Sequence, residues 1–376
     1  MDCQRKLFDI PDGVTYLNAA YMGPLLKSAA EIGEKALRKK LTPWDLPISD
    51  FFGPPNRFYE LSAKLIDANP DDIAIVPSVS YGTAIAAKNI AVKSGQNIVV
   101  MADQFPSNVY AWRELAENSN AEIITVPWPD DGDWTSAILN TINDQTVIVA
   151  TANAHWTNGS YIDLVAVGKK TRTVGASLVL DLTQTLGVVP FSVKDIDPDY
   201  MVTGGYKWLL GPYSFGMLYV APRNQGGKPI EESWITRKGA EDFAKLVDYK
   251  DEYEPGARRF DMGEKSNFIN VPMANEALEV MLGFGIDHIA AYLKTLTDYI
   301  AERARKIGLN VADDKFRVPN LIGINFDDGV PEHLPKVLSD NKVFVSIRGN
   351  SIRVSPHIYN DKSDVDRLFD VLESAL

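Results

Sequence analysis

The stretch LDLTQTLGVVPFSVKDIDPDYMVTGGYKWLLGPYSFGMLYV, residues 180–220, decides the fold of this chain. Three apolar runs end or lie within it: SLVLD (177–181), YMVT (200–203) and GMLYV (216–220). Each run is continuous rather than alternating, which is typical of strands covered by helices on both faces. We therefore predict that Lys207 lies between buried strands of an α/β sheet.

The same pattern extends toward the N-terminus. Four further continuous apolar runs come first: IAIV (73–76), NIVVM (97–101), EIITV (122–126) and TVIVAT (146–151). Helical patterns separate them, including GTAIAAKNIAV, SNVYAWRELAEN and DLVAVGKKTRTVG. This alternation predicts a mostly parallel sheet of seven buried strands with helices on both sides.

The chain is expected to contain a large and a small domain. The polar, turn-rich segment RNQGGKPIEESW follows the last strand, so we place the large domain at residues 15–255. Residues 1–14 and 256–376 are expected to form a small α+β domain, joined through a long helix over about 271–307. Its strands are expected in NLIGINF, VFVSIR and SIRVSPHIY, and its helices in PEHLPKVLSD and DKSDVDRLFDVLESAL.

Composition limits the classes of function. The chain has 376 residues, 45% of them hydrophobic, and a net charge of -12, as in a globular protein without a basic patch for nucleic acid or anionic membranes. Cys3 is the one cysteine, so no disulfide forms within the chain, and we expect a cytoplasmic protein. No G-x-G-x-x-G follows a strand, which argues against a nicotinamide-dependent oxidoreductase, and the four histidines lack metal-ligand spacing.

Two charged residues follow the ends of predicted strands, where α/β sheets bind ligands. Lys207 is either a desolvated, nucleophilic amine or a surface lysine whose stem packs on an apolar loop. Asp181 ends a buried strand, and a buried carboxylate needs a partner. A pyridinium nitrogen would serve, although the same residue could instead cap a helix.

Two more strand ends carry compatible residues. Ser80 and Tyr81, in VPSVSYGTAIAA (76–87), precede a helix start that could bind phosphate, or Ser80 could be a simple N-cap. Phe105 could stack on a flat ring or fill core. An amine, an acid, an anion cradle and an aromatic ring are together the parts that hold pyridoxal phosphate.

With these residues the sequence resembles the class V aminotransferase family of fold-type I pyridoxal-phosphate enzymes. This family includes cysteine desulfurases, kynureninases and isopenicillin N epimerase-like proteins. The resemblance extends from YLNAAYMGPL (16–25) to SIRVSPHIYN (351–360) and is most specific over 180–220. It implies a fold-type I α/β transferase, a homodimer with active sites near the subunit interface, and an amino acid as substrate.

The resemblance also implies roles for individual residues. Lys207 matches the Schiff-base lysine, and Asp181 the residue that holds the pyridine nitrogen. The remaining cofactor contacts match Gln184 beside the phenolic oxygen, Phe105 stacked on the ring, and Tyr206, Ser80 and Tyr81 at the phosphate. Arg353 matches the arginine that binds the substrate α-carboxylate, although a surface arginine remains an alternative. Further substrate contacts match Asn18, Tyr21, His155 and Trp156.

Two departures from the family pattern change the expectations. Desulfurases carry a mobile catalytic cysteine, and only Cys3 exists here, so persulfide-forming activity is not expected. A Gly-Thr pair in the family contacts the phosphate of the partner subunit; here Gly263 matches, but Glu264 would repel a phosphate. Lys265 or Ser266 could substitute in that contact.

The sequence therefore predicts a pyridoxal-phosphate enzyme that acts at the Cα atom of an amino acid. We expect Lys207 to be the general base and acid, and Arg353 to orient the carboxylate. Transamination ranks first, and β-elimination such as C–S cleavage, or epimerisation, are alternatives. A binding or regulatory protein that has lost catalysis is the non-enzyme alternative. The segment TPWDLPISDFFGPP (42–55) either covers the site or packs at the dimer interface.

Overall fold

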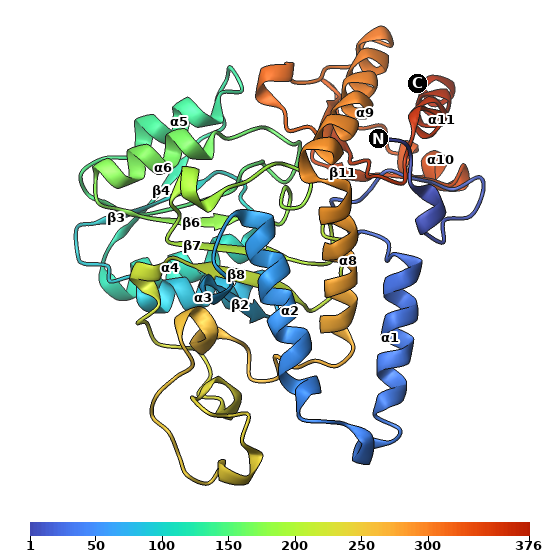
Figure 1. The fold of residues 1–376 in the computed structure, drawn as a ribbon. Coiled ribbons are helices and arrows are strands. Elements are labelled where there is room, and N and C mark those ends of the chain that lie inside the picture. Colours follow the sequence, from blue (N-terminus) through green and yellow to red (C-terminus); the bar gives the residue numbers. More distant parts are fainter.

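Seven strands form the central sheet of the molecule (Figure 1). The structure is a computed structural model that describes residues 1–376. Their order across the sheet is β2 (Ile73–Val76), β8 (Gly216–Val220), β7 (Tyr200–Gly204), β6 (Ser177–Asp181), β5 (Thr146–Thr151), β3 (Asn97–Met101) and β4 (Glu122–Val126). Only β8 runs antiparallel to its neighbours. The mostly parallel sheet is confirmed, and six predicted runs match their strands residue for residue. The seventh extends by Gly204.

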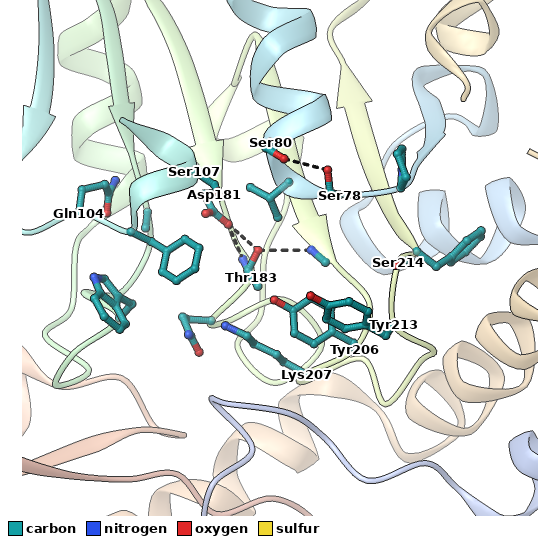
Figure 2. A pocket seen from close by; sticks show the side chains of 18 of the residues that line it. Ser78, Ser80, Gln104, Ser107, Asp181, Thr183, Tyr206, Lys207, Tyr213 and Ser214 are labelled. Atoms are coloured by element: carbon teal, nitrogen blue, oxygen red, sulfur yellow. Dashed lines mark hydrogen bonds between the residues drawn. The ribbon is translucent and has the colours of Figure 1, made fainter. Parts of the chain in front are cut away.

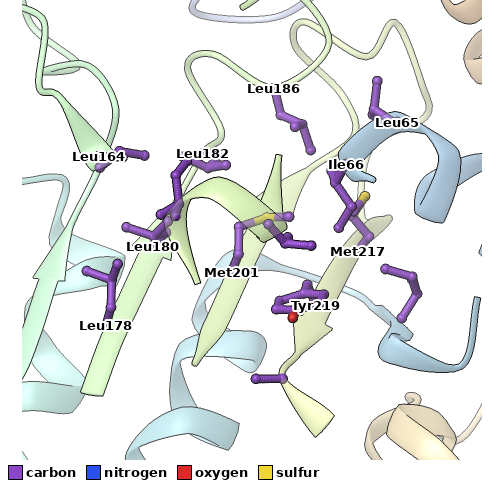
Figure 3. Close-up of a cluster of buried hydrophobic side chains, with 14 of the residues drawn as sticks. Leu65, Ile66, Leu164, Leu178, Leu180, Leu182, Leu186, Met201, Met217 and Tyr219 are labelled. Carbon is purple, nitrogen blue, oxygen red and sulfur yellow. The ribbon is translucent and has the colours of Figure 1, made fainter. Parts of the chain in front are cut away.

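The sheet separates two apolar cores, because successive side chains of a strand point to opposite faces. Helices α2 (Ser49–Ile66), α5 (Trp134–Thr141) and α6 (Leu164–Thr173) cover one face, where Leu180, Met201 and Met217 lie (Figure 3). Helices α3 (Val79–Asn89) and α4 (Tyr110–Ser119) cover the other face, where Val179 and Val202 lie. A short helix, α7 (Val193–Ile196), precedes β7.

Strand β4 is less buried than its sequence EIITV indicates. Only Val126 is buried, while Glu122 and Thr125 are exposed. The strand lies at the edge of the sheet and pairs with β3 alone. The other edge of β4 therefore has no neighbouring strand. This depends on the order of strands in the sheet, which the sequence of the strand alone does not indicate.

The expected long helix over 271–307 is two helices. Helix α8 (Asn270–Phe284) ends and α9 (Ile286–Lys306) begins at Gly285, which has φ +82° and ψ 128°. This positive φ favours glycine and breaks the helical hydrogen-bond ladder. Helix α8 packs against α1 (Lys27–Lys39) and α2 (Figure 1). None of the helices has the length and apolar character required to cross a bilayer.

The C-terminal region contains a second, three-stranded sheet. Its order is β11 (Ser346–Arg348), β12 (Ser351–Val354) and β9 (Ile322–Asn325), all antiparallel. Helices α9, α10 (Leu334–Asp340) and α11 (Lys362–Ala375) pack with it around a separate apolar core. The α+β character expected for this region is present.

The N-terminal segment lies against this C-terminal region. Strand β1 (Thr15–Tyr16) pairs in parallel with β10 (Val343–Phe344). Farther along, the Ala20 backbone N–H donates to Ser355 Oγ at 3.0 Å, between residues 335 positions apart. The expected domain boundary between residues 14 and 15 therefore falls inside a segment that pairs with the C-terminal region.

Candidate active site

A cavity of about 280 Å³ lies at the carboxyl ends of the parallel strands. Loops after β2, β3, β5, β6 and β7 line it, as does the turn before β8, because these chain segments meet at one edge of the sheet. The side chains around the opening are shown in Figure 2. The lining residues are Pro77–Ser80, Gln104, Phe105, Ser107, Ala152, Ala154, Trp156, Asp181, Thr183, Gln184, Gly204, Tyr206, Lys207 and Tyr213–Phe215.

Lys207 places an unpaired amine in this cavity (Figure 2). The residue is only 6% exposed, and its Nζ atom lies 5.5 Å from the ring centroid of Phe105 and 5.6 Å from that of Tyr206. Burial lowers the pKa of Lys207 to about 8, although the Asp181 carboxylate opposes this shift. The result is an amine that is partly neutral near physiological pH and able to act as a nucleophile or base.

Asp181, at the end of β6, presents to the same cavity a carboxylate of which only one oxygen accepts hydrogen bonds from the protein (Figure 2). Its Oδ1 atom accepts hydrogen bonds from the Thr183 backbone N–H at 3.0 Å and from Thr183 Oγ1 at 2.6 Å. The second oxygen, Oδ2, has no protein partner. Burial raises the pKa of Asp181, and the Thr183 bonds and the Lys207 charge oppose that rise. A cationic ligand group at Oδ2 would stabilise the ionised carboxylate.

The N-terminus of helix α3 forms another wall of the cavity. Ser78 caps the helix by accepting from the Tyr81 backbone N–H, and its hydroxyl lies 2.9 Å from Ser80 Oγ. The first amides of a helix have no intrahelical acceptor, so this end favours an anion. Tyr81 is not among the lining residues; burial and the Glu231 carboxylate beside its hydroxyl raise its pKa.

Aromatic side chains line the remaining sides. Phe105 and Trp156 meet edge to face at 5.4 Å, and Tyr206 and Tyr213 do so at 4.8 Å. Phe105 is 37% exposed rather than buried in the core. Its ring therefore borders the cavity and does not fill the core.

Gln184 holds the loop that carries Lys207. Its Oε1 accepts from Trp208 Nε1 at 3.1 Å, and its Nε2 donates to the Ala20 carbonyl at 3.2 Å. One N–H of the amide remains for a ligand in the cavity. His357 secures the same loop from the C-terminal region, since its Nε2 donates to the Trp208 carbonyl at 3.1 Å.

Arg353 is near the cavity but is not among its lining residues. The guanidinium donates to the Trp156 carbonyl at 2.9 Å and to Ser346 Oγ at 3.3 Å, and its Nε has no partner. Burial lowers the pKa of Arg353 to about 9. With 1% exposure, it is a buried cation and not a surface arginine.

Asn18 and Tyr21 line a neighbouring cavity of about 400 Å³ instead. Asn18 Oδ1 accepts from Ser346 Oγ at 2.8 Å, whereas Tyr21 is 58% exposed. Both residues therefore border the hairpin that carries Arg353, rather than the space in front of Lys207.

His155, like Tyr81 and Arg353, lines neither of these two cavities. It is fully buried and stacks on Trp134 at 5.2 Å. Its Nε2 donates to the Ala102 carbonyl, and its Nδ1 lies 2.7 Å from Thr157 Oγ1. Both nitrogens are occupied, so His155 supports the loop and its neighbour Trp156 provides the surface that faces the cavity.

The 261–266 segment is occupied by contacts within the chain. Lys265 is 4% exposed, and its Nζ pairs with Asp261 Oδ2 at 2.9 Å. Ser266 Oγ donates to the Phe51 carbonyl, and the Gly263 backbone N–H donates to Glu231 Oε2 at 2.6 Å. The side chains of Lys265 and Ser266 thus each donate to an acceptor within the chain.

Several lining residues had no role assigned from the sequence. Thr183 binds Asp181, Ser78 caps α3, and Gln104 brings a buried Nε2 that has no partner. Their position directly after buried strands was the available signal. Arg348, on the hairpin with Arg353, gave no signal at all, because a single arginine in VFVSIR is typical of a surface strand.

These residues fit pyridoxal phosphate. The free carboxylate oxygen of Asp181 matches a protonated ring nitrogen, and the amides at the start of α3 match a phosphate. The unpaired Lys207 amine matches a carbonyl carbon, and Gln104 adds a donor without a partner. The Asp181 oxygen, the α3 amides and the Lys207 amine, which have no partner in the protein, thus each have a counterpart on the cofactor.

Comparison with known proteins agrees with this fit. The family model described as "Aminotransferase class-V" matches residues 59–368. The chain is 29% identical over 310 residues to "Uncharacterized aminotransferase YcbU" of Bacillus subtilis (strain 168), covering 82% of this chain and 80% of the relative. It is 27% identical to a "Probable cysteine desulfurase" of Staphylococcus epidermidis, covering 78% and 72%. A solved apo cysteine desulfurase of Thermococcus onnurineus NA1 has the same fold, with TM-score 0.86, 19% identity and coverage of 100% and 98%.

Proposed function

The chain belongs to the class V aminotransferase family, and we propose that it is an aminotransferase that acts at the Cα atom of an amino acid. Its cofactor is pyridoxal 5'-phosphate. One observation carries the proposal. One cavity beside a helix N-terminus contains the unpaired, buried amine of Lys207 and the buried carboxylate of Asp181, which has one oxygen without a protein partner.

Each part of the cavity holds one part of the cofactor in this proposal. Asp181 Oδ2 would accept from the protonated ring nitrogen, and Phe105 would contact the ring face. Ser78 and Ser80, at the start of α3, would donate to the phosphate. Lys207 would bind covalently. When bound, the cofactor supplies an electron-accepting ring that stabilises negative charge at the substrate Cα atom.

The same lysine serves as the proton carrier. Released from its covalent bond, Lys207 would take the proton from Cα as a base and would then donate a proton, as an acid, to the former carbonyl carbon of the cofactor. An amine with a pKa of about 8 does both near neutral pH, because neither its neutral nor its charged form is rare. Arg353 would hold the substrate α-carboxylate, since its buried guanidinium has no carboxylate partner in the protein.

An absorption spectrum tests the proposal. Purified protein supplied with pyridoxal phosphate should develop visible absorbance that gel filtration does not remove. Lys207→Ala should abolish it, while the matched Lys93→Ala, at an exposed lysine, should retain it. A protein that stays colourless would refute the enzyme and leave the non-enzyme alternative, a binding or regulatory protein.

Product analysis distinguishes the reactions. Formation of pyridoxamine phosphate and a keto acid identifies transamination, ammonia with pyruvate identifies a β-lyase, and inversion at Cα identifies an epimerase. A desulfurase reaction that forms a persulfide on the enzyme is not proposed, because it requires a cysteine of the protein at the site. Cys3 lines a separate cavity with Tyr292 and Asp361.

We further propose a homodimer that works in the cytoplasm. Exposed apolar side chains gather around the connection between α1 and α2, where Trp44 is 78% and Leu41 70% exposed. Trp44 belongs to the aromatic, proline-rich stretch 42–55, directly after Leu41, and a second copy would remove both side chains from water. Sedimentation of Trp44→Asp as a monomer, against a dimeric parent, would support this interface. The solitary Cys3 supports a reducing compartment.

A further inference from the structure

The hairpin of β11 and β12 presents two arginines on one face. Ser346 pairs with Arg353 and Arg348 pairs with Ser351 across the hairpin. Residues that pair directly share a face, as do residues two apart, so Arg348 and Arg353 are diagonal neighbours. The hairpin sequence SIRGNSIR repeats the triplet Ser-Ile-Arg. Its isoleucines, Ile347 and Ile352, take the opposite face.

No carboxylate neutralises either arginine. Arg348 donates from Nη1 to the Ile347 carbonyl at 2.7 Å, and its buried Nε has no partner. Arg353 likewise uses only a carbonyl and a hydroxyl, with Nε unpartnered. Burial lowers the pKa of Arg348, and burial together with the nearby Arg348 charge lowers the pKa of Arg353. The two cations therefore destabilise each other without a bound anion.

Arg348 lies between the two cavities. Its guanidinium is 5.5 Å from the ring centroid of Trp156, which lines the cavity of Lys207. Arg348 itself lines the neighbouring cavity with Asn18 and Tyr21. A group attached to a substrate at Lys207 can thus extend past Trp156 toward this guanidinium.

The charges around the site indicate that Arg348 binds an anion that the protein does not supply. Two cations, Arg348 and Arg353, lie beside the site without a carboxylate partner, whereas Lys207 has the Asp181 charge near it and would bind the cofactor covalently. The cofactor phosphate belongs at the start of α3, whose residues line the first cavity, whereas neither arginine does. A substrate α-carboxylate satisfies Arg353. Arg348 is left without an anion.

We propose that Arg348 binds an anionic group on the side chain of the substrate, so that the enzyme selects acidic amino acids. This inference rests on the proposed function, since it places the α-amino acid at Lys207. The shared chemistry is a planar or tetrahedral oxyanion, which a guanidinium fork binds through two hydrogen bonds. Carboxylate, sulfonate and phosphate side chains all present it.

The test compares matched amino acids on the holoenzyme. We would measure kcat/KM for L-aspartate against L-asparagine, L-glutamate against L-glutamine, and L-cysteate and O-phosphoserine against L-serine. Each acidic member should be preferred where its length fits, and the pair with the largest ratio identifies the oxyanion. Arg348→Gln should lower that ratio about 10- to 100-fold, the value of one charge-assisted contact.

Two variants and a spectrum separate the outcomes. Arg348→Lys keeps the charge without the fork and should restore part of the ratio, while Arg305→Gln, at an exposed arginine of α9, should leave it unchanged. Equal loss for acidic and neutral substrates would assign Arg348 to the α-carboxylate and overturn the inference. An unchanged ratio would also overturn it. Visible absorbance and keto-acid formation in the same samples show that the proposed function stands in either case; their absence indicates failure of that function instead.

Discussion

Replacing Thr183 by valine should weaken cofactor binding through Asp181. Thr183 donates two hydrogen bonds to Asp181 Oδ1, and valine removes the one from Oγ1 while keeping a β-branched shape. A hydrogen bond to a charged group contributes about 1.5–3 kcal/mol. Losing that bond would raise the pKa of Asp181 further, because burial already raises it and the Thr183 bonds oppose the rise.

The expected result is a dissociation constant for pyridoxal phosphate that is about 10- to 150-fold higher. The sign of the pH dependence follows from the raised pKa. As pH falls toward the new value, Asp181 becomes protonated and loses its attraction for the ring nitrogen, so the defect should grow at lower pH. Fluorescence titration of the apoprotein in the Lys207→Ala background measures binding without the covalent contribution.

A matched variant controls for the loss of a buried hydroxyl. Thr171, on α6, is also fully buried and donates to the Val167 carbonyl, far from the cavity. Thr171→Val should leave cofactor binding unchanged. Thr183 Oγ1 also accepts from the Gly204 backbone N–H at 3.3 Å, so unfolding temperatures of both variants are needed. Equal dissociation constants for Thr183→Val and its parent across pH would refute the role of Asp181.

Three further predictions concern the lysine loop and the scaffold. Covalent uptake of pyridoxal phosphate by the apoprotein should accelerate as pH rises through about 8, because only the neutral Lys207 amine attacks. Stopped-flow absorbance measures this rate, and an inflection at pH 10.5, the ordinary pKa of a lysine, would contradict the prediction. Gly23→Ala should lower kcat at least about 10-fold in a folded protein, since its Cβ would lie 2.2 Å from the Lys207 carbonyl oxygen, whereas Gly226→Ala meets nothing within 4 Å and should not. Gly283→Ala, exposed within α8 and also without contacts, should raise the free energy of unfolding by about 0.5–1 kcal/mol; a lower urea midpoint would argue against it.

The large sheet was predictable because its strands are buried on both faces. Runs such as SLVLD and NIVVM must be continuous and apolar there, and their ends fall where polar residues begin. The exposure of β4 and the break at Gly285 were not predictable. The first depends on which strand has a neighbour, and the second on whether one glycine takes a positive φ.

The residues of the candidate site were also predictable only in part. Residues directly after strands, Lys207, Asp181 and Phe105, converge because parallel strands end at one edge. Of the residues assigned by the family match alone, Gln184, Tyr206 and Trp156 line the cavity, whereas other assigned residues, Asn18, Tyr21, His155 and Arg353, do not. His155 turned inward because Trp128 and Trp134 enclose its ring, and that packing joins segments far apart in sequence. Arg348 was missed because only the register of the β11–β12 hairpin places it on the same face as Arg353.

The pairing between the two ends of the chain has a consequence for synthesis on the ribosome. The N-terminal strand β1 leaves the ribosome first, yet its partner β10 and the Ser355 contact come more than 300 residues later. Until then the first segment stays unpaired, and contacts of such long range slow folding. The large sheet can assemble earlier, because β8 ends at Val220. A nascent chain would therefore hold Lys207 and Asp181 before it holds Arg353, so cofactor capture can precede the completion of the substrate site.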